Sequence, residues 1–257
     1  MPICKLCHED RVLVRSHIIP DAFNRALKGG MDAPPVMLSN NPRQHPKRRP
    51  GGHYDEDLVC DPCERRFLPW DTCGADFFLN RLPTEGQPLT APNGEAVAHQ
   101  FENVDYTQLK LFAISLLWRA SASSNEFFRR VQLGPYEEAA RQLILNQAPG
   151  TADEFATMIV RWVARPPHEQ LAQTQMSPYR AKLEGVNEVK LFLAGAVMHV
   201  KVDQRPYPEP FPELILRPDR PLVVIARELE GSKDILALRP ALEAAAARAR
   251  DKKRRYT

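Results

Sequence analysis

The stretch CKLCHEDRVLVRSHIIP, residues 4–20, together with LVCDPCERRF, residues 58–67, decides how the first part of this chain folds. Each stretch contains a Cys-x-x-Cys pair, and such a turn presents two thiolates to one ion without strain. Structural zinc takes four soft ligands arranged as a tetrahedron. The two pairs therefore predict one structural zinc ion, bound by Cys4, Cys7, Cys60 and Cys63.

Composition favours a metal site over disulfide bonds. The chain contains no apolar run of the roughly 20 residues that a membrane span needs, and its start, MPICK, has no signal-peptide character. We therefore expect a cytoplasmic protein, in which thiols stay reduced and clustered cysteines bind metal. A redox-sensing dithiol is the alternative, and it would need accessible cysteines. The unpaired Cys73 is expected to be a small buried hydrophobic residue.

Between the two pairs, short ordered segments flank one long loop. Branched residues before the histidine predict a strand, and the apolar spacing after Pro20 predicts a short helix. A region rich in Pro, Gly and Asn then predicts a loop. The expected elements are a strand at Val12–Val14 leading to His17, a helix over Pro20–Leu27, a loop over 31–57, a strand at Leu58–Val59 and a helix over Cys63–Leu68.

This layout is that of a treble-clef zinc finger. With the motif SHIIP (residues 16–20) between its two Cys-x-x-Cys pairs, the chain resembles the zinc-containing HNH, or ββα-metal, endonuclease family over roughly residues 3–72. The resemblance implies a structural zinc, a catalytic Mg²⁺ or Mn²⁺, and His17 as the general base. An imidazole with a pKa of about 6.5 suits that role at neutral pH. Alternatively, His17 bonds a backbone carbonyl within the zinc module.

The sequence departs from the family pattern at three positions. Ser16 stands where Asp or His is usual, Asp55 where Asn is usual, and Glu64 where His follows the last cysteine. Carboxylates suit hard cations, so Asp55 and Glu64 keep a catalytic Mg²⁺ or Mn²⁺ site in reach. The site is thus either a variant or a nuclease scaffold without activity. Three neighbours are candidate substitute ligands or plain surface residues: His53, Asp57 and Asp71.

The rest of the chain predicts helices followed by an antiparallel sheet of three to five strands. A dense apolar run predicts a buried helix of about three turns from Tyr106, and Ser124 would cap a second helix over 124–133. Pro135, Glu137 and Glu138 mark the start of a third helix, which stops at Pro149-Gly150. Strands are predicted at 157–163, 188–192, 196–202 and 221–226.

Residues 105–147, including KLFAISLLWRAS and LGPYEEAARQLILN, are also similar to a group of uncharacterised bacterial proteins with an N-terminal zinc HNH-like segment. In that group, too, a glutamate follows the last zinc cysteine. The resemblance implies that Glu64 is a feature of a subgroup rather than a sign of decay. It implies no particular reaction.

Two basic segments are candidates for contact with nucleic acid. The chain carries a net charge of only +3, so the placement of the charge matters more than its sum. Each segment could contact phosphates and supply salt-dependent affinity for DNA or RNA, or could be simply solvated. The residues concerned are Arg43, Lys47, Arg48 and Arg49 in the long loop, and Arg248, Arg250, Lys252, Lys253, Arg254 and Arg255 in the C-terminal tail.

The sequence therefore predicts an α+β protein with three parts: a zinc-bound HNH-like module at 1–80, a mixed helix and antiparallel-sheet domain at 100–240, and a basic tail at 241–257. The leading function is a metal-dependent endonuclease acting on DNA, in a defence or mobile-element setting. The main alternative is a non-catalytic module in which zinc stabilises a surface that binds nucleic acid or protein. A divalent ion beside His17 separates the two, because only the nuclease needs it.

Overall fold

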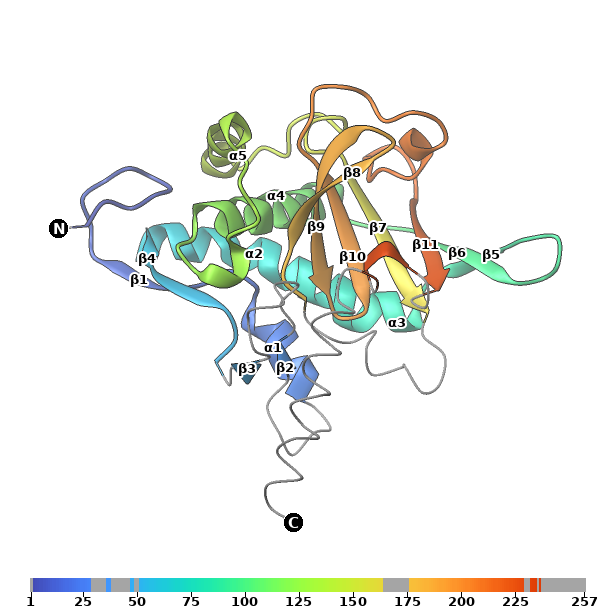
Figure 1. Cartoon of the computed structure of the whole chain (residues 1–257), viewed down its shortest axis with the longest axis horizontal. Helices are drawn as coiled ribbons and strands as arrows, with labels where there is room; N and C mark the ends of the chain where they lie inside the picture. Colours follow the sequence, from blue (N-terminus) through green and yellow to red (C-terminus); the bar gives the residue numbers. More distant parts are fainter. Residues whose placement is uncertain are drawn as a thin grey trace, which may run out of the picture.

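At one end of the molecule in Figure 1, a two-stranded ribbon is followed by a helix, and the N-terminal cysteines lie before, at the end of and after this ribbon. The computed structural model describes residues 2–28, 36–37, 47–48, 51–163, 176–228, 232–234 and 236. Its helices and its mixed sheet confirm the α+β class. The ribbon pairs β1 (Leu13–His17) antiparallel with β4 (Tyr54–Cys60), and α2 (Asp61–Asp76) starts at the next residue.

Three short elements lie between the two strands: α1 (Asp21–Lys28), β2 (Val36–Met37) and β3 (Lys47–Arg48). The predicted helix after Pro20 is confirmed as α1. Two other predictions were too short, because β4 begins at Tyr54 inside the expected loop and α2 extends past Leu68 to Asp76. The first residues of β4 were missed because the stretch YDED is acidic and lacks the branched residues that mark strands.

Helix α2 buries one stripe of side chains at helical spacing, formed by Cys63, Phe67, Trp70 and Gly74. Pro62 in the first turn and the acidic Asp61 and Glu64 suit a helix N-terminus. A Cβ added at Gly74 would lie 2.5 Å from the ring of Phe112, so this glycine allows α2 to approach α4 closely. The chain then continues through a π-helical turn (Phe77–Arg81) and α3 (Leu82–Thr84).

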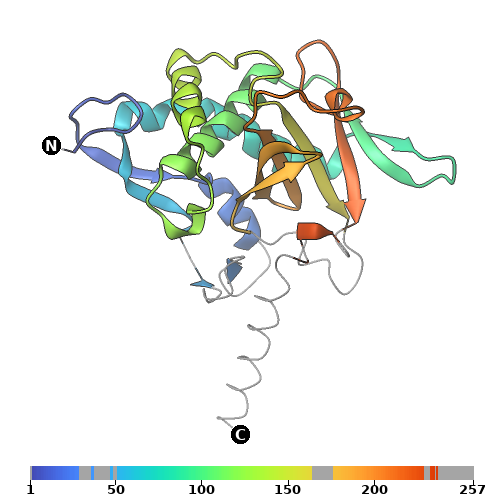
Figure 2. The ribbon, with the colours of Figure 1, turned by 45° about the horizontal axis from the view of Figure 1, so that its top comes forward.

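Helix α4 (Tyr106–Ala122) lies between α2, α5 and the sheet (Figures 1 and 2). The Asp105 side chain caps it by accepting from the Gln108 backbone N–H at 3.0 Å. Its 17 residues make about five turns rather than the predicted three. Every residue from Leu109 to Ala120 is buried, which explains why the apolar run is dense on all sides.

Of the two helices predicted after α4, one forms and the other does not. The third predicted helix is confirmed as α5 (Pro135–Asn146), which ends where Gln147 takes a left-handed backbone with φ of 52°. The predicted helix over 124–133 was wrong. Only a short 3-10 turn, Glu126–Phe128, forms there, and Asn125 rather than Ser124 caps it. The reason is tertiary, because the Ser124 backbone N–H and hydroxyl both donate to Asp55.

The main sheet has seven strands in the order β5-β6-β11-β7-β10-β9-β8. It is mixed rather than antiparallel, since β11 and β7 pair in parallel. The strands are β5 (Gln87–Thr90), β6 (Ala96–Phe101), β7 (Thr157–Val163), β8 (Tyr179–Leu183), β9 (Val186–Leu193), β10 (Ala196–Lys201) and β11 (Leu222–Glu228). The four predicted strands are β7, β9, β10 and β11. Three were missed: β5 and β8 are polar edge strands, and β6, which pairs with β5 and β11, is buried only at Ala98 and Phe101.

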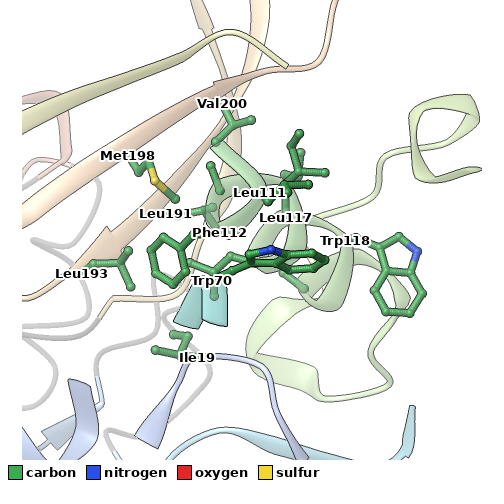
Figure 3. Close-up of a cluster of buried hydrophobic side chains, with 14 of the residues drawn as sticks. Ile19, Trp70, Leu111, Phe112, Leu117, Trp118, Leu191, Leu193, Met198 and Val200 are labelled. Atoms are coloured by element: carbon green, nitrogen blue, oxygen red, sulfur yellow. The ribbon is translucent and has the colours of Figure 1, made fainter. Parts of the chain in front are cut away.

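One hydrophobic core joins the N-terminal module, residues 1–80, to the sheet. Figure 3 shows side chains of α2, α4, β9 and β10 in a single cluster, with Trp70, Phe112, Leu191 and Met198 among them. The same cluster includes Cys4 and Cys60 from the zinc module. A smaller cluster on the other face of the sheet contains Ala156, Met158, Val186, Tyr207 and Ile215. The two predicted domains thus share their packing through α2 and α4. Within the described part of the chain, no helix has both the length and the apolar character to cross a membrane.

Candidate metal centre and the environment of His17

The two cysteine pairs come together as predicted. Cys4 and Cys7 lie in the turn before β1, Cys60 ends β4, and Cys63 lies in the first turn of α2. Their four sulfur atoms all lie within 4.8 Å of one another. We call the turn from Cys4 to Cys7 the knuckle turn. The Lys5 backbone N–H donates to Leu58 O at 3.0 Å, which connects this turn to β4. Four cysteines from three elements therefore form one cluster that could hold a metal such as zinc.

The spacing of the sulfurs fits a tetrahedral zinc ion. With Zn–S bonds of about 2.3 Å, the edge of a regular tetrahedron is about 3.8 Å. The Sγ atoms of Cys7 and Cys60 are 3.8 Å apart. The Cys60 backbone N–H also points at Cys4 Sγ, at 3.4 Å, as suits a charged sulfur. A closed set of four sulfurs leaves no open position on the ion, so such a zinc would be structural.

The electrostatics of the cluster also call for a cation. Burial opposes ionisation of Cys4, but backbone N–H groups of Cys7, Cys60 and Leu6 outweigh it and lower its pKa to about 7. Burial, followed by the neighbouring sulfurs of Cys60 and Cys4, raises the pKa of Cys63. Four thiolates at these distances repel one another unless a positive ion lies between them. A divalent metal would remove that conflict.

Helices α4 and α5 hold the knuckle turn from outside. Lys5 Nζ donates to Ala122 O at 2.7 Å, at the end of α4, and Arg141 Nη1 of α5 donates to Leu6 O at 2.5 Å. Both contacts join residues more than a hundred positions apart in sequence. The cysteine cluster is thus attached to the second half of the chain.

His17, the predicted general base, is the last residue of β1 and is half-buried. Its Nε2 lies 3.3 Å from the Gly51 carbonyl oxygen, and its ring meets the Tyr54 ring edge to face at 6.2 Å. Its own carbonyl oxygen accepts from Arg119 Nη1 at 2.7 Å. The ring and the main chain of His17 are therefore each held by a separate contact.

Asp55 lies on the other face of the ribbon from His17. In β1 and β4, Ser16 pairs with Asp55 and His17 with Tyr54, and neighbouring side chains alternate between faces. The Asp55 carboxylate accepts four hydrogen bonds, from the Asp57 and Ser124 backbone N–H groups and from the hydroxyls of Ser123 and Ser124. Burial opposes its ionisation, but these bonds lower its pKa. Oδ2 is thus occupied by the turn that follows α4, and Oδ1 by the backbone of β4.

Glu64 differs from Asp55 in having a buried oxygen left over. Among the described residues, Glu64 Oε2 has no hydrogen-bond partner, and neither has Ser16 Oγ. A buried carboxylate oxygen without a donor is costly unless a cation or water satisfies it. Both residues stand at positions where the sequence departs from the HNH pattern that it resembles. The geometry thus leaves Glu64 able to bind a cation.

The three candidate substitute metal ligands, His53, Asp57 and Asp71, do not lie together. His53 is buried and stacks on Phe127, with ring centroids 3.7 Å apart. Asp57 is exposed on β4, and Asp71 forms an ion pair with Arg119. In the ranges that the structure describes, the cysteine cluster is the only group of three or more Cys, His, Asp or Glu side chains close enough to share an ion. His17, Asp55 and Glu64 do not form such a group.

Two residues next to His17 were not predicted, namely Gly51 and Arg119. Gly51 acts through its backbone, which carries no sequence signal. Arg119 stands in the apolar run SLLWRAS, and an arginine inside a buried helix needs an anionic partner. That argument could have pointed to Arg119, although not to the identity of its partner.

The predicted contacts with nucleic acid lie largely outside the described residues. This holds for Arg43, Arg49 and the tail residues after 237. Lys47 and Arg48 form β3, of which only the backbone is described.

Comparisons of the chain with protein-family models, with curated proteins and with solved structures each found no match. The assignment of a function therefore depends on the cysteine cluster and on the geometry around His17.

Proposed function

We propose that this protein is a metal-dependent, HNH-like endonuclease that hydrolyses phosphodiester bonds in DNA, with His17 as the general base. The observation that carries the proposal is the orientation of the His17 ring, whose Nε2 lies 3.3 Å from Gly51 O. The same contact is expected if His17 is structural, so the cleavage assays below decide between the two roles. A carbonyl oxygen only accepts, so Nε2 carries the proton in this contact and the neutral ring presents Nδ1 as an acceptor. An imidazole oriented in this way can take a proton from water.

The ribbon and helix around His17 support the same proposal. β1, β4 and α2 occur in the order strand, strand, helix, with α1, β2 and β3 between the two strands, and the cysteine cluster joins the turn before β1 to β4 and α2. A structural zinc there would fix the angle between the ribbon and α2. It would thereby hold His17, at the end of β1, in a constant relation to Glu64 in the first turn of α2.

Glu64 is the residue that would hold a catalytic Mg²⁺ or Mn²⁺ in this proposal. Its unpartnered buried oxygen fits a hard cation, which prefers oxygen ligands. When bound, such an ion would offset the charge that develops on the phosphate and the leaving oxygen. We assign Asp55 to the structure of the turn after α4 instead, because its oxygens already accept four hydrogen bonds.

The substrate and its setting follow from the same proposal. A DNA backbone would be contacted by the basic loop residues Arg43, Lys47, Arg48 and Arg49 and by the basic tail. The activity would take place in the cytoplasm. Weaker cleavage with rising salt would support the phosphate contacts.

A non-catalytic, zinc-stabilised binding module is the second candidate. One observation favours it: the described residues near His17 do not include three side chains able to share a cation. In this case the fold of the zinc module would serve only to present a binding surface. Cleavage assays with a series of divalent ions separate the two candidates.

We expect His17→Ala to lower the rate of DNA cleavage by a factor on the order of 10² or more, because the variant lacks the general base. Rates of plasmid and oligonucleotide cleavage would be measured with Mg²⁺, Mn²⁺, Co²⁺ and Ni²⁺. Zinc content and melting temperature should stay at their wild-type values. Loss of zinc and stability together would show that His17 is structural instead.

A matched control for this variant is His99→Ala. His99 lies in β6, at the end of the molecule opposite β1 in Figure 1, so its removal should leave cleavage unchanged. Wild-type protein that cleaves none of the substrates with any of the ions would favour the binding module.

We expect Glu64→Ala to raise the concentration of Mg²⁺ or Mn²⁺ needed for half-maximal cleavage by a factor on the order of ten, or to abolish cleavage. Glu64→His should favour softer ions such as Co²⁺ and Ni²⁺. Glu56→Ala, which removes an exposed carboxylate from β4, is the control. Normal cleavage by Glu64→Ala at limiting Mg²⁺ would show that Glu64 is not a ligand.

A further inference from the structure

Arg119 of α4 is a fully buried cation beside the predicted general base. Its guanidinium has five N–H donors, and the structure shows five hydrogen bonds from it. Nε donates to Ser115 O at 3.3 Å, and Nη2 donates to Ser115 Oγ at 3.2 Å and to Asp71 Oδ1 at 2.5 Å. Nη1 donates to Asp71 Oδ2 at 2.9 Å and to His17 O at 2.7 Å. The donor set of Arg119 is complete.

This arrangement uses the shape of arginine. The two-pronged contact with Asp71 matches a planar fork to a carboxylate, and the remaining donors reach two different elements. The guanidinium also lies over the Phe67 ring, 4.6 Å from its centroid. A lysine has one charged nitrogen with three donors and could not make these contacts together. The site therefore specifies arginine rather than any cation.

The side chain of Arg119 connects three elements through its hydrogen bonds. Asp71 belongs to α2, Arg119 to α4, and the accepting carbonyl to His17 at the end of β1. The His17 ring has its own contact with Gly51 O on another segment. Arg119 thus holds the backbone of His17 while Gly51 holds its ring.

We propose that Arg119, fixed by Asp71, is a positioning residue that sets the backbone of His17 and so aims its imidazole at the water that attacks the scissile phosphate. This inference rests on the proposed nuclease function. It gives the second half of the chain a part in the reaction, because Arg119 lies 102 residues after His17. It also pairs the Asp71 carboxylate, which is held by two hydrogen bonds from Arg119.

A purely structural ion pair is the competing explanation, and an apolar replacement of both partners separates the two. Removing one partner leaves a buried charge unpaired and destabilises the protein, whereas replacing both with apolar residues of similar size often preserves stability. Arg119→Met with Asp71→Leu should therefore fold. The double variant would still lack the donor to His17 O.

The test measures folding, DNA cleavage and the ¹⁵N NMR signals of the His17 ring in the full-length protein. We expect the double variant to keep its zinc and a cooperative melting transition. Its kcat should fall by a factor on the order of 10², with KM nearly unchanged, because the base is displaced rather than the substrate site. The ¹⁵N signals of the His17 ring, assigned by their absence in His17→Ala, should shift. Arg119→Lys, which keeps a cation opposite Asp71, should fold and show the same two changes.

Lys110→Met is the matched control. Lys110 is another buried basic residue of α4, but its Nζ donates to Phe155 O at 2.8 Å and to Ala152 O at 3.3 Å, near the start of β7. Its removal should leave the His17 signals and kcat unchanged. Folded Arg119 variants with wild-type ring signals would overturn the positioning role. If wild-type protein cleaves no DNA, the nuclease proposal fails, while the ring signals still decide whether Arg119 positions His17.

Discussion

Replacement of Cys60 by serine is expected to release zinc and unfold the N-terminal module. Cys60 is 1% exposed, and its sulfur is 3.8 Å from that of Cys7. The unfolded chain has no preformed site, so the binding free energy of a structural zinc, about 10 kcal/mol or more, contributes to folding. Elemental analysis should find about one equivalent of zinc in wild-type protein. The variant should contain far less and show a lower melting temperature.

Cys73→Ser is the matched control for this experiment. Cys73 lies in the same helix, α2, but outside the group of four sulfurs, so the variant should keep its zinc. A chelator should lower the melting temperature of the wild type and of Cys73→Ser alike. Wild-type protein that is folded, reduced and free of zinc would contradict the metal centre.

Asp55→Ala is expected to destabilise the protein by about 3 kcal/mol, because a buried carboxylate and four hydrogen bonds to it are lost. Two of the donors left behind are the backbone N–H and the hydroxyl of Ser124, in the turn that joins α4 to the next segment. Urea unfolding would measure the change. Asp57→Ala removes an exposed carboxylate two residues away and should change stability little. Equal effects of the two substitutions would show that the Asp55 contacts contribute nothing.

The stabilising effect of Asp55 should also depend on pH. Its pKa is lower in the folded protein than in the unfolded chain, so the folded state favours the charged form. The contribution is complete above the unfolded pKa of about 4. It is lost as the pH falls through the lower folded pKa. The difference in unfolding free energy between wild type and Asp55→Asn should therefore shrink below about pH 4.

Contacts from the second half of the chain support the packing of the N-terminal module, residues 1–80. Lys5 and Arg141 tie the knuckle turn to α4 and α5, and Arg119 ties the end of β1 to α4. The hydrophobic core runs from Cys4 to the strands of the sheet. Residues 1–80 therefore depend for part of their packing on the helices that follow. We therefore expect the position of the His17 backbone to depend on the packing of α4 against β1.

Several features were determined by local sequence alone. The Cys-x-x-Cys spacing predicted which four cysteines come together, because each pair can meet one ion within a single turn. Pro135 and the acidic residues after it predicted the start of α5, and the apolar run after Tyr106 predicted that α4 is buried. The strands β7, β9 and β10 were recognisable by their branched, apolar residues. All these signals act over a few residues.

Other features were decided only by the tertiary structure. The partners of Asp55 lie 68 and 69 positions away, and Asp71 lies 48 positions from Arg119. The parallel pairing of β11 with β7 likewise joins strands separated by three others in sequence. Local spacing contains no information about such contacts, because the partners meet only when burial brings distant segments together. The four cysteines could be recognised from sequence because each pair is local, whereas the contacts of Asp55 and of the His17 backbone depend on where α4 packs.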